Sequence, residues 1–368
     1  MKILVLQDHL RSGGTERQSV LLSRAFASSG HGSHLLTFRP GGVLASTVDG
    51  AVTCRALQPF DTGLDWFAPG LMGAVERLRP DIVLCMGRMA NCYAGSLQGL
   101  MQDRWPHVAV IATMRTGKPL PWLFRRSLRQ VRHIVANSRE AAQTLIDAHG
   151  VAMGKITVIY NSLVFRPASP GTRNPALREK WGASPATGIL LNVAMFRPEK
   201  NQRELIEIVG DLPRDANLQL WLAGDGPARA ECERLVAQRG WGDIIKFIGY
   251  ERDPAPLYAA ADFAVHASWS ESLSNFLIEA QAHGLPSVAY AAQGIAECGL
   301  PGETGFVLAR GDRAAFRATL TRLLAEPLAT RMRRAAAARA FARETFDPAR
   351  QSASYLELFQ RLTAKPPP

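Results

Sequence analysis

Several familiar patterns are absent from this sequence. Its 368 residues contain no run of about 20 uncharged apolar residues, which a membrane-spanning helix requires, and the apolar opening at residues 3–6 is too short for a signal peptide. A cytoplasmic protein is therefore expected. The G-x-G-x-x-G sequence of dinucleotide-binding oxidoreductases is also missing after this opening, where Gly13 and Gly14 stand alone.

Cysteine is scarce and scattered. The chain has five cysteines, an odd number, with no C-x-x-C pair and no histidine nearby at the spacing of a metal site. This pattern predicts buried, reduced thiols. The five are Cys54, Cys85, Cys92, Cys232 and Cys298.

Acidic residues are outnumbered by basic ones. With 43 Lys and Arg against 32 Asp and Glu, the formal net charge is +11 and the pI is near 9.8. This charge favours an anionic partner, which can be a membrane surface, a nucleic acid or a phosphorylated substrate. The basic residues are not interleaved with aromatic ones on one strand or helix face, which argues against a nucleic-acid binder.

The chain is longer than one hydrophobic core usually organises, and it alternates short apolar runs with helical patterns. This rhythm predicts two α/β domains with parallel, doubly wound sheets. A Pro/Gly/Arg-rich segment at 165–172 is interpreted as the linker between an N-terminal domain at 1–168 and a C-terminal domain at 169–347. An amphipathic helix at 348–363 must dock on an apolar surface. The predicted strands cover residues 3–6, 33–38, 81–86, 108–114, 133–137 and 156–160, then 188–193, 218–223, 244–248, 263–267, 287–290 and 305–308.

A pair of glutamates spans a predicted junction between a loop and a helix. Glu271 and Glu279 begin and end the sequence ESLSNFLIE, in which Ser272 or Ser274 is a candidate N-cap. Glu271 then lies in the loop and Glu279 about two turns into the helix. Backbone N–H groups at the helix start suit a phosphate, and the carboxylates suit hydroxyl groups. Taken alone, the pair is also compatible with two solvated glutamates.

A basic loop follows the first strand of the second domain, at the strand end where ligands bind in open α/β sheets. Within the sequence NVAMFRPEKN, Arg197 offers a planar fork to phosphate oxygens and Lys200 offers a point charge. Together they are suited to neutralise a departing diphosphate. A solvated basic loop is the alternative interpretation.

These two motifs, in this order, resemble the signature of the family 4 retaining glycosyltransferases, which have the GT-B fold. Further segments agree with the resemblance: LAGDGP at 222–227 is similar to the family's strand-end turn, FIGY at 247–250 to its base-binding strand, and GIAE at 294–297 and GETG at 302–305 to the segments that follow the glutamate pair. The resemblance covers residues 185–362 well and the first half loosely.

The clearest match in the first half is SGGTERQ at residues 12–18. In the family this loop lies over the donor phosphates. Paired glycines permit close backbone approach, and Thr15 with Gln18 fits a capping box that starts the next helix. Read without the resemblance, Gly13 and Gly14 indicate a plain turn.

The resemblance implies two Rossmann-like domains that face a cleft, with the C-terminal helix crossing back to the first domain. It implies a hexosyltransferase that takes a nucleotide sugar and retains the anomeric configuration. Glu279 would bind the ribose hydroxyls and Glu271 the donor sugar, while Arg197, Lys200 and the N–H groups near Ser274 stabilise the departing diphosphate. The catalytic residues implied are Glu271, Arg197 and Lys200; the donor-binding residues are Gly13, Gly14, Arg197, Lys200, Gly224, Gly249, Ser274, Asn275, Phe276 and Glu279.

The expected donor is a UDP-sugar, with GDP-mannose as the other possibility, and the expected acceptor is a glycan or a lipid-linked molecule of polysaccharide or lipopolysaccharide biosynthesis. No Asp-x-Asp occurs in the chain, so no divalent metal is expected, and no other cofactor is implied. The chain departs from the family at Ser272 and Ser274, where glycine is usual, and at Ala267, where proline is usual. Arg115 stands where many members have a histidine, and its partner is the donor or the acceptor.

Residues 121–133 predict a basic amphipathic helix, with Phe124, Leu128 and Val131 on one stripe and arginines on the neighbouring one. Such a helix can lie on an anionic membrane surface, or it can face the core with a solvated basic side. Peripheral attachment to the inner face of the cytoplasmic membrane is expected, because many transferases of this type act on lipid-linked acceptors. The residues that would contact the membrane are Trp122, Phe124, Arg125, Arg126, Arg129 and Arg132.

A sugar-nucleotide 2-epimerase on the same two-domain plan is the alternative function. It converts a UDP-sugar without an acceptor, whereas a transferase requires one. The glutamate pair with its Arg-x-x-Lys partner favours transfer.

Overall fold

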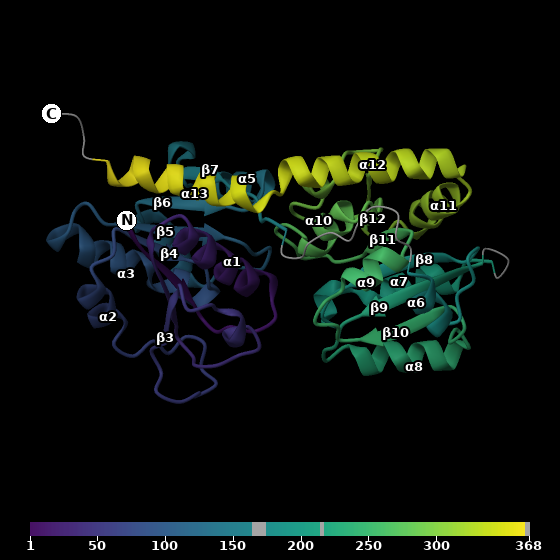
Figure 1. Ribbon diagram of the computed structural model, residues 1–368, viewed down its shortest axis with the longest axis horizontal. Helices are drawn as coiled ribbons and strands as arrows, with labels where there is room; N and C mark the ends of the chain where they lie inside the picture. The colour runs from purple at the N-terminus through teal and green to yellow at the C-terminus, as the bar shows by residue number, and fades with distance from the viewer. Residues whose placement is uncertain (164–173, 214–216, 365–368) are drawn as a thin grey trace. The chain divides into compact units, whose positions relative to one another are not determined.

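The computed structural model describes residues 1–163, 174–213 and 217–364, and the chain divides into two compact units (Figure 1). Unit 1 comprises Met1–Val164 together with Pro348–Pro368, and unit 2 comprises Phe165–Asp347. The expected linker at 165–172 and the expected boundary between residues 168 and 169 lie outside the described residues.

Unit 1 is built on a seven-stranded parallel sheet with the strand order β3-β2-β1-β4-β5-β6-β7. The predicted doubly wound sheet is confirmed. Strand β3 is the one that sequence reasoning missed, because its four residues are exposed and show no apolar run. The elements are β1 (Lys2–Gln7), α1 (Gly14–Ser28), β2 (Gly32–Thr37), β3 (Thr53–Ala56), α2 (Leu71–Leu78), β4 (Ile82–Cys85), α3 (Arg88–Arg104), β5 (Ala109–Met114), α4 (Trp122–Gln130), β6 (His133–Ala136), α5 (Arg139–His149), β7 (Ile156–Val158) and α13 (Pro348–Thr363), with 3-10 turns at Ala45–Thr47 and Met153–Lys155.

Alternate residues of the central strands enter two different cores. In β1, Leu4 and Leu6 pack on the side of α2, α3, α4 and α5, whereas Ile3 and Val5 pack on the side of α1 and α13. A strand that is buried on both faces is apolar throughout, which is why these strands were recognisable in the sequence. The final helix α13 lies beside α1, with the Phe359 ring 5.5 Å from the Phe26 ring (Figure 1).

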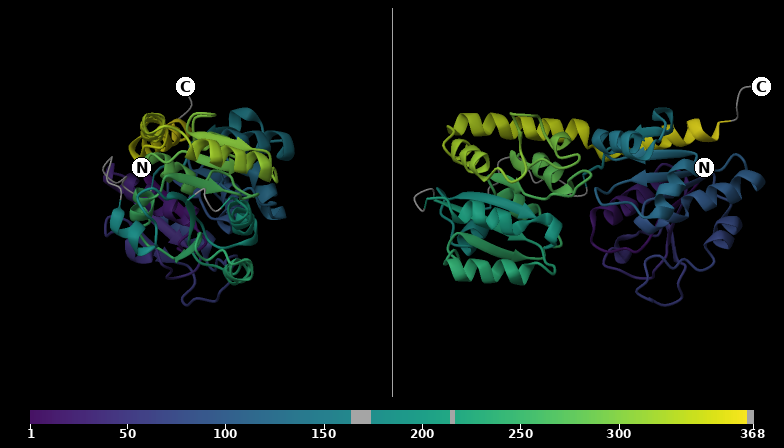
Figure 2. Two further views of the ribbon diagram at one scale, coloured as in Figure 1. Left: turned by 90° about the vertical axis from the view of Figure 1, so that its right-hand side faces the viewer. Right: turned by 180° about the vertical axis from the view of Figure 1, so that it is seen from behind.

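Unit 2 is built on a six-stranded parallel sheet with the order β10-β9-β8-β11-β12-β13, and all six strands were predicted within one residue at either end. Helices cover both faces of this sheet (Figures 1 and 2). The elements are α6 (Pro175–Lys180), β8 (Gly188–Val193), η3 (Pro198–Lys200), α7 (Gln202–Gly210), β9 (Leu218–Ala223), α8 (Arg229–Arg239), β10 (Ile245–Gly249), α9 (Ala255–Ala260), β11 (Phe263–His266), α10 (Asn275–Ala282), β12 (Ser287–Tyr290), η5 (Ala296–Cys298), β13 (Gly305–Leu308), α11 (Arg313–Leu324) and α12 (Leu328–Thr345).

The cysteines are free, as expected, but one of them, Cys54, is not buried as predicted. Cys85, Cys232 and Cys298 are buried and Cys92 is half-buried, whereas Cys54 is exposed because it lies on the edge strand β3. Among the described helices, none combines the length and the apolar character that crossing a bilayer requires.

Candidate functional site

The carboxyl edge of the unit 2 sheet collects the residues that carry the two motifs. The strand order reverses between β8 and β11, which are neighbours in the sheet although β9 and β10 lie between them in the chain. Ligands of open α/β sheets bind at such a reversal, outside the carboxyl ends of the strands. Lys200 follows β8 and Glu271 follows β11, so the two motifs meet at this point.

The basic loop after β8 forms the short turn η3, and its two cationic side chains differ in their ion pairing. Lys200 Nζ lies 2.5 Å from Glu271 Oε1, and the lysine side chain is 25% exposed. Arg197 is half-buried, and among the described residues its guanidinium has no ion-pair partner. The loop is anchored to the segment after β11, because the Glu199 carbonyl accepts hydrogen bonds from Trp269 N–H and Ser268 Oγ.

Glu271 is held by two donors on one oxygen. Its side chain is 9% exposed, and Oε1 accepts from both Lys200 Nζ and His266 Nε2, the latter at 2.9 Å. Burial alone would raise the pKa of this carboxyl, but the adjacent Lys200 ammonium and the His266 hydrogen bond lower it from 4.5 to about 2. Glu271 is therefore an ionised acceptor throughout the neutral range.

Helix α10 begins at Asn275, and Ser274 is its N-cap: Ser274 Oγ accepts a hydrogen bond from Leu277 N–H. This decides between the two serines that the sequence offered. Glu279 lies in the second turn and is buried, with Oε2 accepting from Tyr258 Oη at 2.8 Å. The Tyr258 ring stacks on Phe276 and on His283, and these contacts restrict the position of its hydroxyl.

A glycine after β9 and the last residue of β10, also a glycine, let the backbone approach closely at the same edge. Gly224 has φ +134°, and a Cβ built there would lie 2.0 Å from the Ala194 carbonyl oxygen of the loop after β8. Its N–H donates to the carbonyl of Gly249, which has φ +90°. Both positions require glycine for backbone reasons alone, so their presence in the motif is explained without a ligand.

In unit 1 the glycine loop was predicted correctly as a turn before a helix, but its capping box is wrong. Helix α1 begins at Gly14 with Gly13 in the N-cap position, so the N-cap residue has no side chain to cap the helix. Thr15 is already inside the helix. Gln18 instead exchanges hydrogen bonds with the backbone of Ser162 and accepts one from Gln351 Nε2 of α13.

Arg115 follows β5, and its guanidinium is engaged within unit 1. It donates to Asn161 Oδ1 and, at 2.7 Å, to Tyr355 Oη of α13. These bonds tie α13 to the carboxyl edge of the sheet and give Arg115 a structural role. A contact of Arg115 with donor or acceptor stays a prediction.

The amphipathic pattern of α4 faces the core, which corrects the expected membrane contact of Phe124. Phe124, Leu128 and Val131 are at most 1% exposed and belong to the unit 1 core, because α4 packs against α3. The outer surface of the helix carries Trp122 and Leu123, which are 60% and 50% exposed, and an Arg126 guanidinium over the Trp122 ring. Arg125, Arg129 and Arg132 are also exposed.

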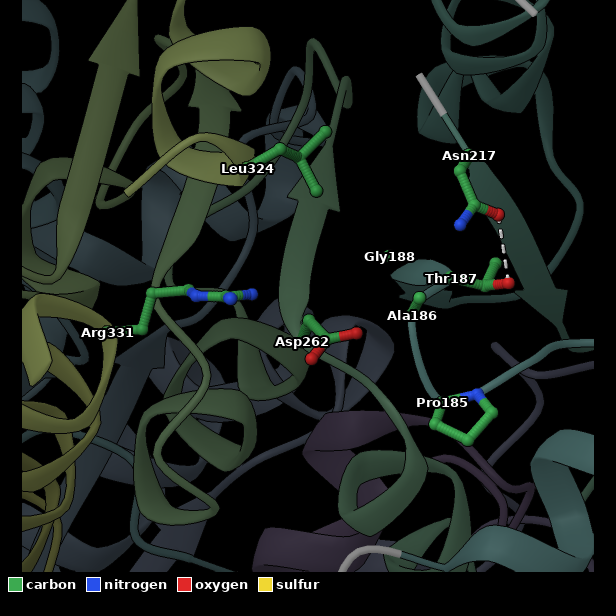
Figure 3. Close-up of a pocket in the computed structure, with 8 residues that line it drawn as sticks. All are labelled: Pro185, Ala186, Thr187, Gly188, Asn217, Asp262, Leu324 and Arg331. Atoms are coloured by element: carbon green, nitrogen blue, oxygen red, sulfur yellow. Dashed lines mark hydrogen bonds between the residues drawn. The ribbon is translucent and has the colours of Figure 1, made fainter. Parts of the chain in front are cut away.

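A polar cavity of about 160 Å³ lies at the opposite, amino edge of the unit 2 sheet (Figure 3). Two of its polar residues are bound by hydrogen bonds at the start of the sheet: the Asp262 carboxylate accepts from Arg178 and from the N–H of Ile189, which lie outside the lining, and Thr187 Oγ1 donates to Asn217. These contacts hold the start of the sheet together. None of the predicted site residues lines this cavity.

Sequence reasoning missed His266, Tyr258 and Asp8. His266 and Tyr258 hold the two motif glutamates. For His266 the available signal was a polar residue at the end of an otherwise apolar strand, whereas Tyr258 lies in the short helix α9. Asp8 follows β1 and accepts hydrogen bonds from the N–H groups of Met89 and Ala90 at the start of α3, across the reversal point of the unit 1 sheet. Burial raises the pKa of Asp8 from 3.8 to about 6. Among the described residues, no group of three or more His, Cys, Asp or Glu is placed to hold a metal ion.

Two family models match the chain, one in each unit. The model described as Glycosyltransferase Family 4 matches residues 12–163, and the model described as Glycosyl transferases group 1 matches residues 174–341. Together they cover most of both units.

Curated relatives include the lipopolysaccharide core biosynthesis glycosyltransferase LpsE of Rhizobium meliloti (strain 1021), which is 30% identical over 138 residues. This match covers 38% of the chain and 40% of LpsE. The D-inositol 3-phosphate glycosyltransferase of Mycobacterium sp. (strain KMS) is 27% identical over 361 residues, which covers 91% of the chain and 80% of the relative. Over LpsE and the next relatives in order of similarity, the chain spans roughly a third to three fifths of their length.

Solved structures of similar fold include Anabaena HepE in complex with UDP, with a TM-score of 0.82, 21% identity and coverage of 98% of this chain and 100% of HepE. HepE has also been solved with UDP-glucose. WaaG, a glycosyltransferase involved in lipopolysaccharide biosynthesis, has a TM-score of 0.75 and 18% identity and covers 99% of this chain and 100% of its own. The predicted GT-B fold is thereby confirmed.

Proposed function

The chain belongs to the family 4 glycosyltransferases, and from this premise we propose that it transfers a sugar from a nucleotide-sugar donor to a glycan or lipid-linked acceptor, with retention of configuration. A UDP-sugar is the proposed donor, and GDP-mannose is the second candidate. The UDP and UDP-glucose complexes of HepE support the donor class, and the lipopolysaccharide relatives support the acceptor class. Retention is proposed from family membership alone.

The observation that carries the proposal is the Lys200–Glu271 ion pair across the reversal of the unit 2 sheet. It places a cation, an ionised carboxylate and the N-terminus of α10 at one strand edge. Charge builds up on the diphosphate as the glycosidic bond breaks, so donors fixed in place there stabilise the transition state more than the ground state. Arg197, which has no ion-pair partner among the described residues, meets the diphosphate without breaking an existing pair, whereas Lys200 must share its interactions with Glu271.

The two glutamates divide the rest of the donor in this proposal. Glu279 binds the ribose hydroxyls, with one oxygen already held by Tyr258. Glu271 contacts the hydroxyls of the donor sugar through Oε2, since Oε1 is taken by Lys200 and His266. A carboxylate accepts from two neighbouring hydroxyls without a change of protonation, which suits a polyol ligand.

We also propose that no divalent metal takes part, since fixed cations and a helix N-terminus supply the positive charge. Turnover should then be the same with excess EDTA as with added Mg²⁺ or Mn²⁺. A loss of turnover in EDTA that Mg²⁺ restores would refute this part of the proposal and leave sugar transfer intact.

Ligand-observed NMR with a panel of UDP- and GDP-sugars tests the donor assignment. Binding of a nucleotide sugar by the wild type is expected to be lost in Glu279→Ala and retained in Glu303→Gln, an exposed glutamate at the amino end of β13. Equal binding by both variants would show the ribose assignment to be wrong. Accumulation of an epimerised UDP-sugar without any acceptor would instead favour the 2-epimerase.

A membrane-bound acceptor is supported by the outer surface of α4, where Trp122 and Leu123 are exposed beside four arginines. An exposed aromatic and an exposed aliphatic side chain beside several arginines suit the interface of an anionic bilayer. Co-sedimentation with anionic vesicles at low salt should fall in the Trp122→Ser/Leu123→Ser variant and persist in Trp66→Ser, which removes an exposed tryptophan elsewhere in unit 1. No binding by the wild type would remove the membrane from the proposal.

A further inference from the structure

His266 is the last residue of β11, and its imidazole is buried beneath the candidate site. The side chain is 1% exposed, and the ring centroid lies 5.9 Å from that of Phe276 in the first turn of α10. Its Nε2 is 2.9 Å from Glu271 Oε1, the oxygen that also accepts from Lys200. The histidine therefore contacts the motif glutamate from the protein side, where solvent does not reach.

The role of Nε2 in the His266 ring follows from its partner. An ionised carboxylate can only accept, so Nε2 carries the proton and donates to Glu271. Among the described residues, Nδ1 is buried without a hydrogen-bond partner. His266 is thus a donor to Glu271 with a fixed direction.

The two donors on Glu271 Oε1 differ in what donor binding does to them. Lys200 is a flexible cation, and in the proposed function it turns toward the departing diphosphate. His266 is confined by β11 and by Phe276, and its Nε2 is directed at Glu271. The hydrogen bond from His266 is therefore the one that holds the carboxylate while Lys200 changes partners.

We propose that His266 is a positioning residue: its hydrogen bond fixes the Glu271 carboxylate so that Oε2 is directed at the hydroxyls of the donor sugar. This inference rests on the proposed function. It assigns His266 to recognition of the sugar, as distinct from the nucleotide, and it makes sugar affinity depend on a residue that does not touch the donor.

The test compares binding of a nucleotide sugar with binding of the bare nucleoside diphosphate, measured by calorimetry on the full chain. In the wild type, the sugar should add to the affinity for UDP. His266→Leu should lose about tenfold of affinity for the UDP-sugar and leave the affinity for UDP within about threefold. A residue with a merely structural role would weaken both ligands equally, and that result would overturn the inference.

Two substitutions of His266 by amide residues provide a second comparison. It remains informative even if His266→Leu does not fold. The amide nitrogen of glutamine reaches the position of Nε2, whereas that of asparagine reaches the position of Nδ1, away from Glu271. His266→Gln should therefore retain sugar affinity and His266→Asn should lose it. The opposite order, or no difference between the two, would contradict the proposal.

A double-mutant cycle of His266→Leu with Glu271→Gln distinguishes a failure of this inference from a failure of the proposed function. If His266 acts through Glu271, the double variant His266→Leu/Glu271→Gln should bind the UDP-sugar no more weakly than Glu271→Gln alone. If the wild type gains affinity from the sugar and His266→Leu keeps that gain, only the positioning role is wrong. If the wild type binds no nucleotide sugar, or binds it no better than UDP, the proposed function fails and the positioning role with it.

Discussion

Replacing Lys200 by methionine removes the ammonium from Glu271 and keeps a side chain of similar length. The Glu271 side chain, which is 9% exposed in the intact protein, would keep the hydrogen bond from His266 and lose its cation. In the intact protein the pKa of Glu271 is about 2, against 4.5 in a free side chain: burial is the largest single influence and works against this lowering, and the Lys200 and His266 interactions together outweigh it. At about 1.4 kcal/mol per tenfold change in proton affinity, the difference corresponds to about 3 kcal/mol, of which Lys200 supplies the largest favourable part.

We therefore expect Lys200→Met to destabilise the β11–α10 region by about 2 to 3 kcal/mol at pH 7, because it leaves a buried carboxylate without its cation. Glu271→Gln should cost less, since Lys200 is 25% exposed and can turn to solvent. In the double variant neither charge remains, and the two costs should not add; the expected coupling is about 2 kcal/mol. Hydrogen exchange of the amides in β11 and α10, followed by mass spectrometry, measures the local stability.

The pH dependence provides an independent check on the same reasoning. A carboxyl whose pKa is lowered on folding contributes stability above its unfolded pKa of 4.5 and loses it as the pH falls toward 2. The difference between wild type and Lys200→Met should be constant from pH 7 to pH 5 and shrink below pH 4.5. Additive effects in the double variant, or a difference that is the same at pH 3 as at pH 7, would refute the ion pair as the source of the stability.

Three further predictions test other parts of the molecule. Gly224→Ala should destabilise unit 2 by about 3 kcal/mol in urea denaturation, because φ is +134° and the new Cβ would meet a carbonyl of the loop after β8 at 2.0 Å; Gly242→Ala, with no atom within 4 Å, should be neutral. The Asp8 carboxyl carbon should titrate near pH 6 by NMR, so its stabilising contribution is complete below pH 3.8 and lost as the pH rises through 6; a midpoint near 3.8 would contradict its burial. Tyr258→Phe should weaken UDP binding about tenfold, since Glu279 loses a buried hydrogen bond of 2.8 Å, and unchanged UDP affinity would show that Tyr258 does not orient Glu279.

Most of the architecture was predictable from the sequence, because parallel strands covered on both faces are apolar without interruption. The strands β8 and β11 are buried on both sides, and each ends where a polar motif begins. The edge strand β3 has no such run, so nothing in its residues distinguishes it from a loop. The strands that could be predicted are thus the central ones, which are buried on both faces of the sheet.

The amphipathic helix α4 shows a different limit. The 3.6-residue period of Phe124, Leu128 and Val131 indicates that one face is covered, and it does not indicate what covers it. In the structure, α3 covers this face of α4. The hydrogen bond from the N–H of Gly95 to Ser127 Oγ shows how closely the two helices approach. A membrane and a neighbouring helix leave the same pattern in the sequence.

The motif glutamates were found from spacing, but their partners were not, because a hydrogen bond between side chains depends on which elements the fold brings together. Tyr258 lies in the short helix α9 that precedes β11, and His266 ends that strand; both side chains contact a carboxylate that belongs to α10 or the loop before it. Each glutamate consequently has one oxygen held by a buried aromatic side chain. Fixing the carboxylates in advance lowers the entropy lost when a polyhydroxyl ligand binds, so the buried partners belong to the site as much as the motif does.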